Sequence, residues 1–233
     1  RVEQLIATKL RNTRRTWGKR SLLESLARLD RMTPRTASTV EAHLRDGDPQ
    51  IRLLAALALE SAGHPLPPLL EVALTVLDDP LYFGFAHERT HSAADEGVSP
   101  AFMVSDGNFL ETKTLLWIAR LGPKAASISE ELERRRGTIQ DLSSLDYAIA
   151  RIQGAKPPVS AARKALSLLL WSPSIILVEE PYWDLEKDMF QLLSELGPDA
   201  RPALPFLKTL TRFPNPYRDT AIATIEEIDG KGN

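Results

Sequence analysis

The residues best suited to chemistry lie in the run His87-Glu88-Arg89-Thr90-His91. On a helix, this H-E-x-x-H spacing would place two imidazoles one turn apart, where they could share a zinc ion. Glu88 would then be the base that takes a proton from the bound water. Glu111, twenty residues after His91, offers a third ligand. Together these residues would make a zinc-dependent hydrolase, which we keep as an alternative.

The surroundings of this run favour an ordinary polar helix face. No strand is predicted upstream to bind the backbone of a substrate. Glu111 also has a simpler explanation, because an acidic residue near a helix start interacts favourably with the positive end of the helix dipole. We therefore expect no catalytic residue, no bound metal and no cofactor.

A basic cluster in the first twenty residues is a candidate partner-binding site. Its members are Arg11, Arg14, Arg15, Trp17, Lys19 and Arg20. The cations could contact phosphates while Trp17 stacks on a base, which makes a nucleic-acid-binding protein the other alternative. A solvated helix face explains the same residues, and we favour that interpretation over nucleic acid.

Tyr182 and Trp183 form another candidate partner-binding site, because they lie in an acidic stretch. Between Glu179 and Asp199 there are seven acidic residues and only one basic residue, Lys187. Such a segment could dock a basic partner. A loop followed by a helix with an acidic first turn explains the same residues, and we favour that interpretation.

Composition narrows the class of protein. The 233 residues are 43% hydrophobic and 26% charged, which is ordinary for a folded domain. A net charge of -2 gives no global attraction to nucleic acid or membrane. With no cysteine, disulfides and thiolate metal sites are excluded. No apolar run approaches the roughly 18 residues that span a bilayer.

The chain begins at Arg1 without a signal-like segment. We therefore expect a piece of a longer bacterial protein, whose compartment is unknown. The default is a soluble cytoplasmic protein, and the expected truncation leaves export open.

The elements expected to position these residues are helices. Apolar residues recur at spacings of three and four, as at Ile51, Leu54, Ala55 and Ala58. Trp117 lies on such a stripe and is expected in the core. Four predicted helices run into a glycine that would end them in a left-handed conformation, at Gly63, Gly122, Gly154 and Gly197. The sequence therefore predicts an all-α fold.

Two segments resemble a HEAT repeat of the PBS-lyase HEAT-like type. The run from Asp46 through Asp48-Pro49 to Arg52, followed by Leu53–Leu59, resembles its turn and second helix. Leu196–Pro205 resembles the entry to its first helix, and Leu121–Ala126 is a weaker copy. The resemblance implies an armadillo-like α-α superhelix, or solenoid, that binds macromolecules, and it implies no particular activity.

The glycine spacing sets the expected repeat boundaries. The intervals from Gly122 to Gly154 and from Gly197 to Gly230 are 32 and 33 residues, whereas Gly63 to Gly122 is 59. The long interval predicts an insertion near 80–107, with 96–107 in a loop. We expect one solenoid over 1–233 with about six stacked pairs, the first within 1–35.

These observations favour a non-catalytic scaffold. It would present a curved helical surface to a protein partner or to a catalytic domain of the same polypeptide, without spanning a membrane.

Overall fold

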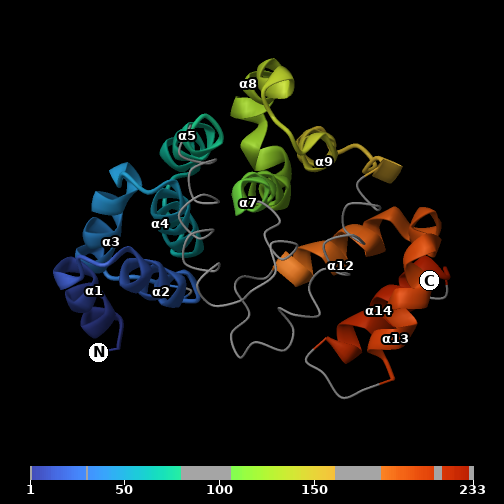
Figure 1. Cartoon of the computed structure of the whole chain (residues 1–233), viewed down its shortest axis with the longest axis horizontal. Coiled ribbons are helices and arrows are strands. Elements are labelled where there is room, and N and C mark those ends of the chain that lie inside the picture. The colour runs from blue at the N-terminus through green and yellow to red at the C-terminus, as the bar shows by residue number, and fades with distance from the viewer. Residues whose placement is uncertain (1, 30, 80–105, 161–184, 213–216, 231–233) are drawn as a thin grey trace, which may run out of the picture. The chain divides into compact units, whose positions relative to one another are not determined.

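The computed structural model describes residues 2–29, 31–79, 106–160, 185–212 and 217–230. Every regular element in these ranges is a helix, and none of the described residues lies in a strand. The prediction of an all-α fold is therefore confirmed (Figure 1). Among the described helices, none is both long and apolar enough to cross a bilayer. The chain divides into two compact units, residues 1–114 and 115–233.

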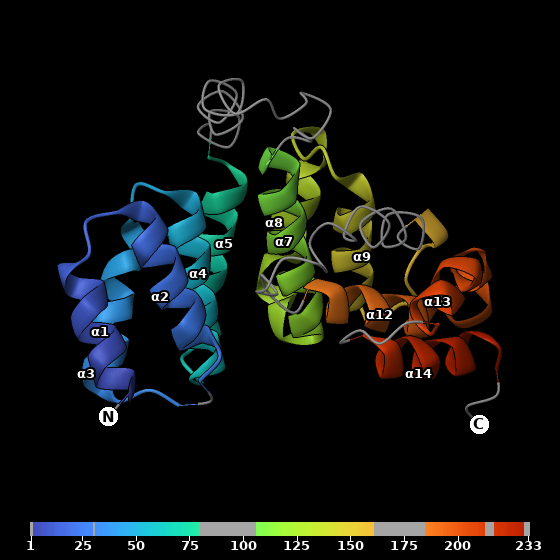
Figure 2. The ribbon, with the colours of Figure 1, turned by 60° about the horizontal axis from the view of Figure 1, so that its bottom comes forward.

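Unit 1 is built from helices that pack in pairs and on the next pair. Its elements are α1 (Val2–Asn12), α2 (Thr16–Ala27), α3 (Pro34–Glu41), the 3-10 helix η1 (Ala42–Arg45), α4 (Pro49–Ser61) and α5 (Leu66–Leu77). Helices α1 and α2 pack together, as do α3 and α4, and α4 also packs on α5. Between pairs, α1 packs on α3 and α2 packs on α4, as Figure 2 shows.

The core of unit 1 is centred on α4. Its residues from Leu53 to Leu59 are all buried, which encloses every face of the helix over nearly two turns. Helices α2, α3 and α5 each contact α4 and supply this cover. A helix that is apolar all round needs such cover, because each exposed face would leave hydrophobic surface in water.

Unit 2 is also built from α-helices and 3-10 helices in its described part. The long helix α7 (Asp106–Leu121) crosses the division between the units. It is followed by η4 (Gly122–Ile128), α8 (Ser129–Arg134), η5 (Arg135–Gly137), α9 (Leu142–Ile152), α12 (Leu185–Leu196), η6 (Gly197–Ala203), α13 (Leu204–Leu210) and α14 (Arg218–Ile228). Helix α9 packs on η4 and α8, while α12 and α13 pack on α14.

Glycines end the helices as predicted. Gly63, Gly122, Gly154 and Gly197 all have positive φ, between 55° and 81°. After α4, the backbone N–H of His64 donates to the carbonyl of Leu59 at 3.0 Å and that of Gly63 to Glu60 at 2.9 Å. This is the Schellman arrangement, which satisfies carbonyls left open at a helix end and requires a left-handed residue.

Leu196–Pro205 and its weaker copy Leu121–Ala126 also share a local structure. Gly122 and Gly197 both have φ of 55°, and each opens a seven-residue 3-10 helix that continues into an α-helix. The alanine three residues after each glycine, Ala125 or Ala200, is buried. The similarity of sequence is therefore accompanied by the same backbone path.

The structure corrects the start of α7. The predicted loop over 96–107 reaches too far, because α7 already begins at Asp106; residues 80–105 lie outside the described ranges. Glu111 is thus the sixth residue of α7, beyond the first turn in which the helix dipole acts, and it is buried. The dipole explanation for Glu111 is therefore wrong. Trp117 is 2% exposed, which confirms its place in the core.

Candidate functional site

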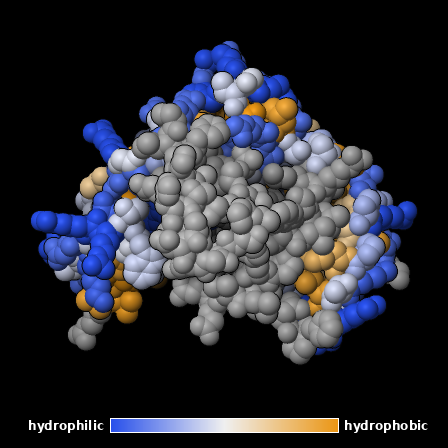
Figure 3. Space-filling model, in the orientation of Figure 1, coloured by the Kyte–Doolittle hydropathy of each residue, from blue (hydrophilic) through white to orange (hydrophobic). Residues whose placement is uncertain are grey.

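The basic N-terminal residues gather at the junction of α1 and α2. Helix α1 ends at Asn12 and α2 begins at Thr16, so the two helices are joined by a short turn containing Arg14 and Arg15. Gly18 lets the helices approach closely, because a Cβ atom there would lie 2.7 Å from Thr13 Cγ2. Around α1 and α3, hydrophilic side chains dominate the surface seen in Figure 3.

A groove opens beside this junction, and we call it the basic groove. Its volume is about 790 Å³. It is lined by the end of α1 and the following turn, the start of α2, one face of α3, and η1: Leu10, Arg11, Thr13, Arg14, Lys19, Arg35, Ser38, Thr39, Ala42 and His43. No Asp or Glu of the described residues contributes to the lining.

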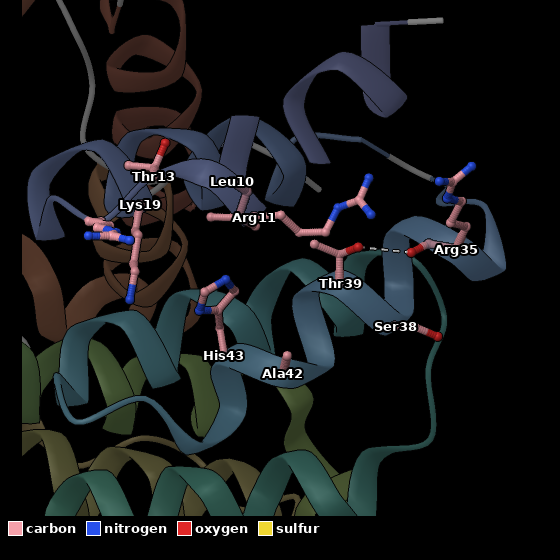
Figure 4. Close-up of a pocket in the computed structure, with 10 residues that line it drawn as sticks. Leu10, Arg11, Thr13, Lys19, Arg35, Ser38, Thr39, Ala42 and His43 are labelled. Atoms are coloured by element: carbon pink, nitrogen blue, oxygen red, sulfur yellow. Dashed lines mark hydrogen bonds between the residues drawn. The ribbon is translucent and has the colours of Figure 1, made fainter. Parts of the chain in front are cut away.

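One end of the basic groove is electrostatically compensated. Figure 4 shows Lys19 and His43 approaching each other there. Lys19 Nζ lies 2.7 Å and His43 Nδ1 lies 3.4 Å from the same oxygen of Asp46, Oδ2. Burial would raise the pKa of Asp46, but hydrogen bonds from Lys19 and from the Asp48 N–H hold that pKa below its ordinary value. At this end of the groove, Lys19 therefore stabilises the folded chain through its ion pair with Asp46.

The other end of the basic groove keeps its positive charge. Arg11 and Arg35 hold their guanidinium groups at this end in Figure 4, and both side chains are exposed. Arg11 makes one long hydrogen bond, 3.4 Å to the Thr8 hydroxyl. Within the described part of the chain, neither Arg14 nor Arg35 forms an ion pair. Such a surface attracts anions, because the guanidinium groups face water and have no carboxylate to neutralise them.

Hydroxyl groups add a donor to this end of the groove. The Thr39 hydroxyl donates to the Arg35 carbonyl at 3.0 Å and the Thr13 hydroxyl donates to the Lys9 carbonyl at 2.7 Å, so both protons are already used. The Ser38 hydroxyl has no hydrogen bond in the described ranges and is exposed. It can therefore donate to a bound anion.

The other predicted basic-cluster residues have different surroundings. Arg20 Nη2 lies 2.6 Å from Asp48 Oδ2, and both side chains are largely buried. Asp48 also caps α4, since its Oδ1 accepts the N–H groups of Gln50 and Ile51. Arg20 thus ties α2 to the start of α4. Arg15 is exposed, and Trp17 in the first turn of α2 is 73% exposed.

Of the predicted metal-site residues, only Glu111 lies in the part of the chain that the structure describes. His87, Glu88 and His91 lie outside the described residues. Among those that are described, no three His, Asp or Glu side chains are placed to hold a metal ion. Glu111 lies in a run of buried polar residues of α7 that continues through Thr114.

The other candidate partner-binding site lies outside the residues that the structure describes. Tyr182 and Trp183 are not in the described ranges. Glu195 and Asp199, which belong to the same acidic stretch, both form ion pairs. Glu195 pairs with Arg151 at 3.1 Å, and Asp199 pairs with Lys156 at 2.6 Å.

Sequence reasoning missed the wall of the groove formed by α3 and η1. Arg35, Ser38 and Ala42 are exposed while Ala37 and Val40 are buried. A spacing of three and four between the exposed positions is the signal that could have found this face. It does not reveal that the face lies opposite Arg11, which depends on the packing of α1 on α3.

Comparison with known proteins finds no matching protein family, no matching curated protein and no matching solved structure.

Proposed function

We propose that the chain is a non-catalytic interaction module made of HEAT-like helix pairs, and that unit 1 binds an acidic macromolecular partner in the basic groove. The observation that carries this proposal is the uncompensated end of the groove. Arg11 and Arg35 face water there and Arg14 lines the same groove, and none of the three forms an ion pair within the described ranges.

The contrast with other arginines of the chain supports this proposal. In η5 and the end of α8, Arg134 and Arg135 both pair with Glu131, and Arg136 pairs with Glu133 and Asp146. A run of three arginines is thus neutralised by its own surroundings. Among the described residues, the groove arginines have no such acidic neighbours, so the charges of a partner can take their place.

Ion pairs at a regular interval support the repeat. Arg20 in α2 pairs with Asp48, 28 residues later, and Arg52 in α4 pairs with Asp79, 27 residues later. Asp48 and Asp79 each precede a proline in the sequence. Each ion pair therefore links an arginine of one α-helix, α2 or α4, to the aspartate of an Asp-Pro sequence beyond the next α-helix. This is the nearest-neighbour contact expected of a stacked repeat.

The groove walls are cross-linked before any partner binds. Glu3 Oε1 of α1 accepts the backbone N–H of Thr33 at 2.6 Å and its hydroxyl at 2.9 Å, just before α3 begins. Lys19 of α2 holds Asp46 beyond η1. Because the walls are fixed in this way, binding would cost less ordering of the chain.

The test measures binding to a generic polyanion. Fluorescently labelled heparin should bind the chain at low salt and dissociate as salt rises, since counterion release drives such binding. The variant Arg14→Ser/Arg35→Ser should bind about tenfold more weakly or worse. The control Arg201→Ser/Lys208→Ser removes two exposed cations of unit 2, so it has the same net charge. It should bind like the parent.

Two results would contradict the proposal. One is the absence of binding at low salt by the folded protein. The other is an equal loss of affinity in the groove variant and the control, because that would show attraction by net charge without a site.

A further inference from the structure

We propose that the basic groove holds the backbone of a single-stranded nucleic acid, and that Trp17 stacks on one of its bases. This inference rests on the proposed function and names the chemical class of the acidic partner. It joins two observations on unit 1: a groove lined by Arg11, Arg14 and Arg35, which form no ion pair in the described ranges, and an exposed indole ring three residues from Arg14.

The phosphates would lie at the uncompensated end. Arginine binds phosphate oxygens through two parallel N–H donors, so Arg11 and Arg35 at one end can each hold a phosphate. Arg14 lines the same groove from the α1–α2 turn. The free Ser38 hydroxyl adds a neutral donor. The groove is open to solvent, so a flexible chain can enter and leave it.

Trp17 has the exposure of a stacking platform. It is 73% exposed, although tryptophan is on average a highly buried residue. Burial in the core therefore does not explain the ring. Base stacking on an exposed aromatic ring contributes most of the base-dependent affinity of proteins that bind single strands without sequence preference.

Trp17 lies close enough to the groove to act with it. It follows the groove residue Arg14 by three positions, and three residues of chain span at most about 11 Å. A strand with phosphates in the groove can therefore extend a neighbouring base over the indole.

The combination favours single strands over other polyanions. A duplex keeps its bases stacked inside, so their faces cannot reach Trp17. An acidic peptide could satisfy the cations but offers no ring beside each charge. In a single strand, every phosphate is accompanied by a base with a free face.

The experiment compares three labelled or competing probes on the whole chain: an oligothymidylate of about 16 nucleotides, the same length of mixed-sequence duplex, and inorganic polyphosphate. Anisotropy gives the affinity for each probe. The variants are Trp17→Ala, Trp17→Phe and Arg14→Ser/Arg35→Ser, with Arg201→Ser/Lys208→Ser as the control. Circular dichroism confirms that each variant keeps the parent's helix content.

The parent should bind the oligothymidylate more tightly than the duplex. Trp17→Ala should weaken oligothymidylate binding by about 5- to 150-fold, and Trp17→Phe should restore most of it. Neither change should alter polyphosphate binding. The logarithm of the affinity should fall with the logarithm of salt concentration with a slope of about −2 if three phosphates are held, and Arg14→Ser/Arg35→Ser should make it shallower by about 1.4.

Other outcomes separate the two proposals. If the groove variant weakens binding of all probes but Trp17→Ala changes none, single-stranded nucleic acid is wrong while the acidic partner stands. Tighter binding to the duplex than to the single strand overturns this inference in the same way. If neither oligothymidylate nor polyphosphate binds at low salt, both proposals fail.

Discussion

Asp46 is the residue on which several contacts of unit 1 converge. Its carboxylate forms an ion pair with Lys19, contacts His43 and accepts a hydrogen bond from the Asp48 N–H at 3.1 Å. Its backbone carbonyl accepts a hydrogen bond from the Arg52 guanidinium at 2.9 Å. It joins α2, η1 and α4 in this way. A single acidic side chain therefore fixes both the turn before α4 and the compensated end of the basic groove.

The lowered pKa of Asp46 predicts how stability depends on pH. Its folded pKa lies below the ordinary value of 3.8, so the unfolded chain binds the proton more readily. The stabilisation is therefore fully present above pH 3.8 and is lost as pH falls through the folded pKa. Urea denaturation at a series of pH values should show Asp46→Asn less stable than the parent near neutrality. The difference should shrink in acid, and a constant difference over the series would contradict this account.

The α1–α2 junction depends on the missing side chain of Gly18. Alanine is favoured over glycine inside a helix by about 1 kcal/mol, but here the added Cβ would meet Thr13 Cγ2 at 2.7 Å. We expect Gly18→Ala to destabilise the parent. In a Thr13→Ser background the methyl group is gone and the hydroxyl remains, so the same change should stabilise by up to about 1 kcal/mol.

Chemical denaturation of the four proteins in this double-mutant cycle measures the effect of Gly18→Ala on the unfolding free energy in each background. Destabilisation of equal size in both backgrounds would mean that contact with Thr13 does not limit the approach of α1 and α2.

The end of α4 depends on a left-handed residue. Gly63 has φ of 81° and open space around its missing Cβ, so only backbone strain opposes a larger residue. Gly63→Ala should therefore cost about 1–2 kcal/mol of unfolding free energy. Gly47 is the matched control, because it also has open space but lacks a positive φ. Gly47→Ala should be close to neutral in the same denaturation assay, and equal costs at the two sites would refute the explanation.

The division into two compact units predicts how far the destabilising effect of a core mutation extends along the chain. Leu54 in α4 and Leu193 in α12 are both fully buried, one in each unit. Truncation to alanine should cost about 2–5 kcal/mol at either site. In a stacked repeat, each pair contacts mainly its neighbours, so the loss should be local.

Native-state hydrogen exchange followed by mass spectrometry can show whether the loss of stability stays within one unit. Leu54→Ala should lower protection mainly in α2, α4 and α5, whereas Leu193→Ala should lower it mainly in α12 and α14. If either variant lowered protection equally in both units, the chain would unfold as one cooperative body.

Local sequence determined where the described helices end and which faces they bury. Gly63 and Gly154 end α4 and α9 because only glycine adopts a left-handed conformation without cost. Asp48 before Pro49 begins α4 because its carboxylate caps the first N–H groups. The spacing of apolar residues placed Trp117 in the core. These features depend on contacts within a few residues, which is why the sequence alone could predict them.

The tertiary structure decided which charges remain available. From sequence, Lys19, Arg20, Arg11 and Arg14 were equivalent members of one basic cluster. Packing of α2 on α4 brings Asp46 and Asp48 to Lys19 and Arg20, whereas packing of α1 on α3 brings Arg35 and Ser38 beside Arg11. Whether a cation is neutralised depends on carboxylates that are about 27 residues away in the chain and only a few ångströms away in space. No pattern within one helix can determine that distance.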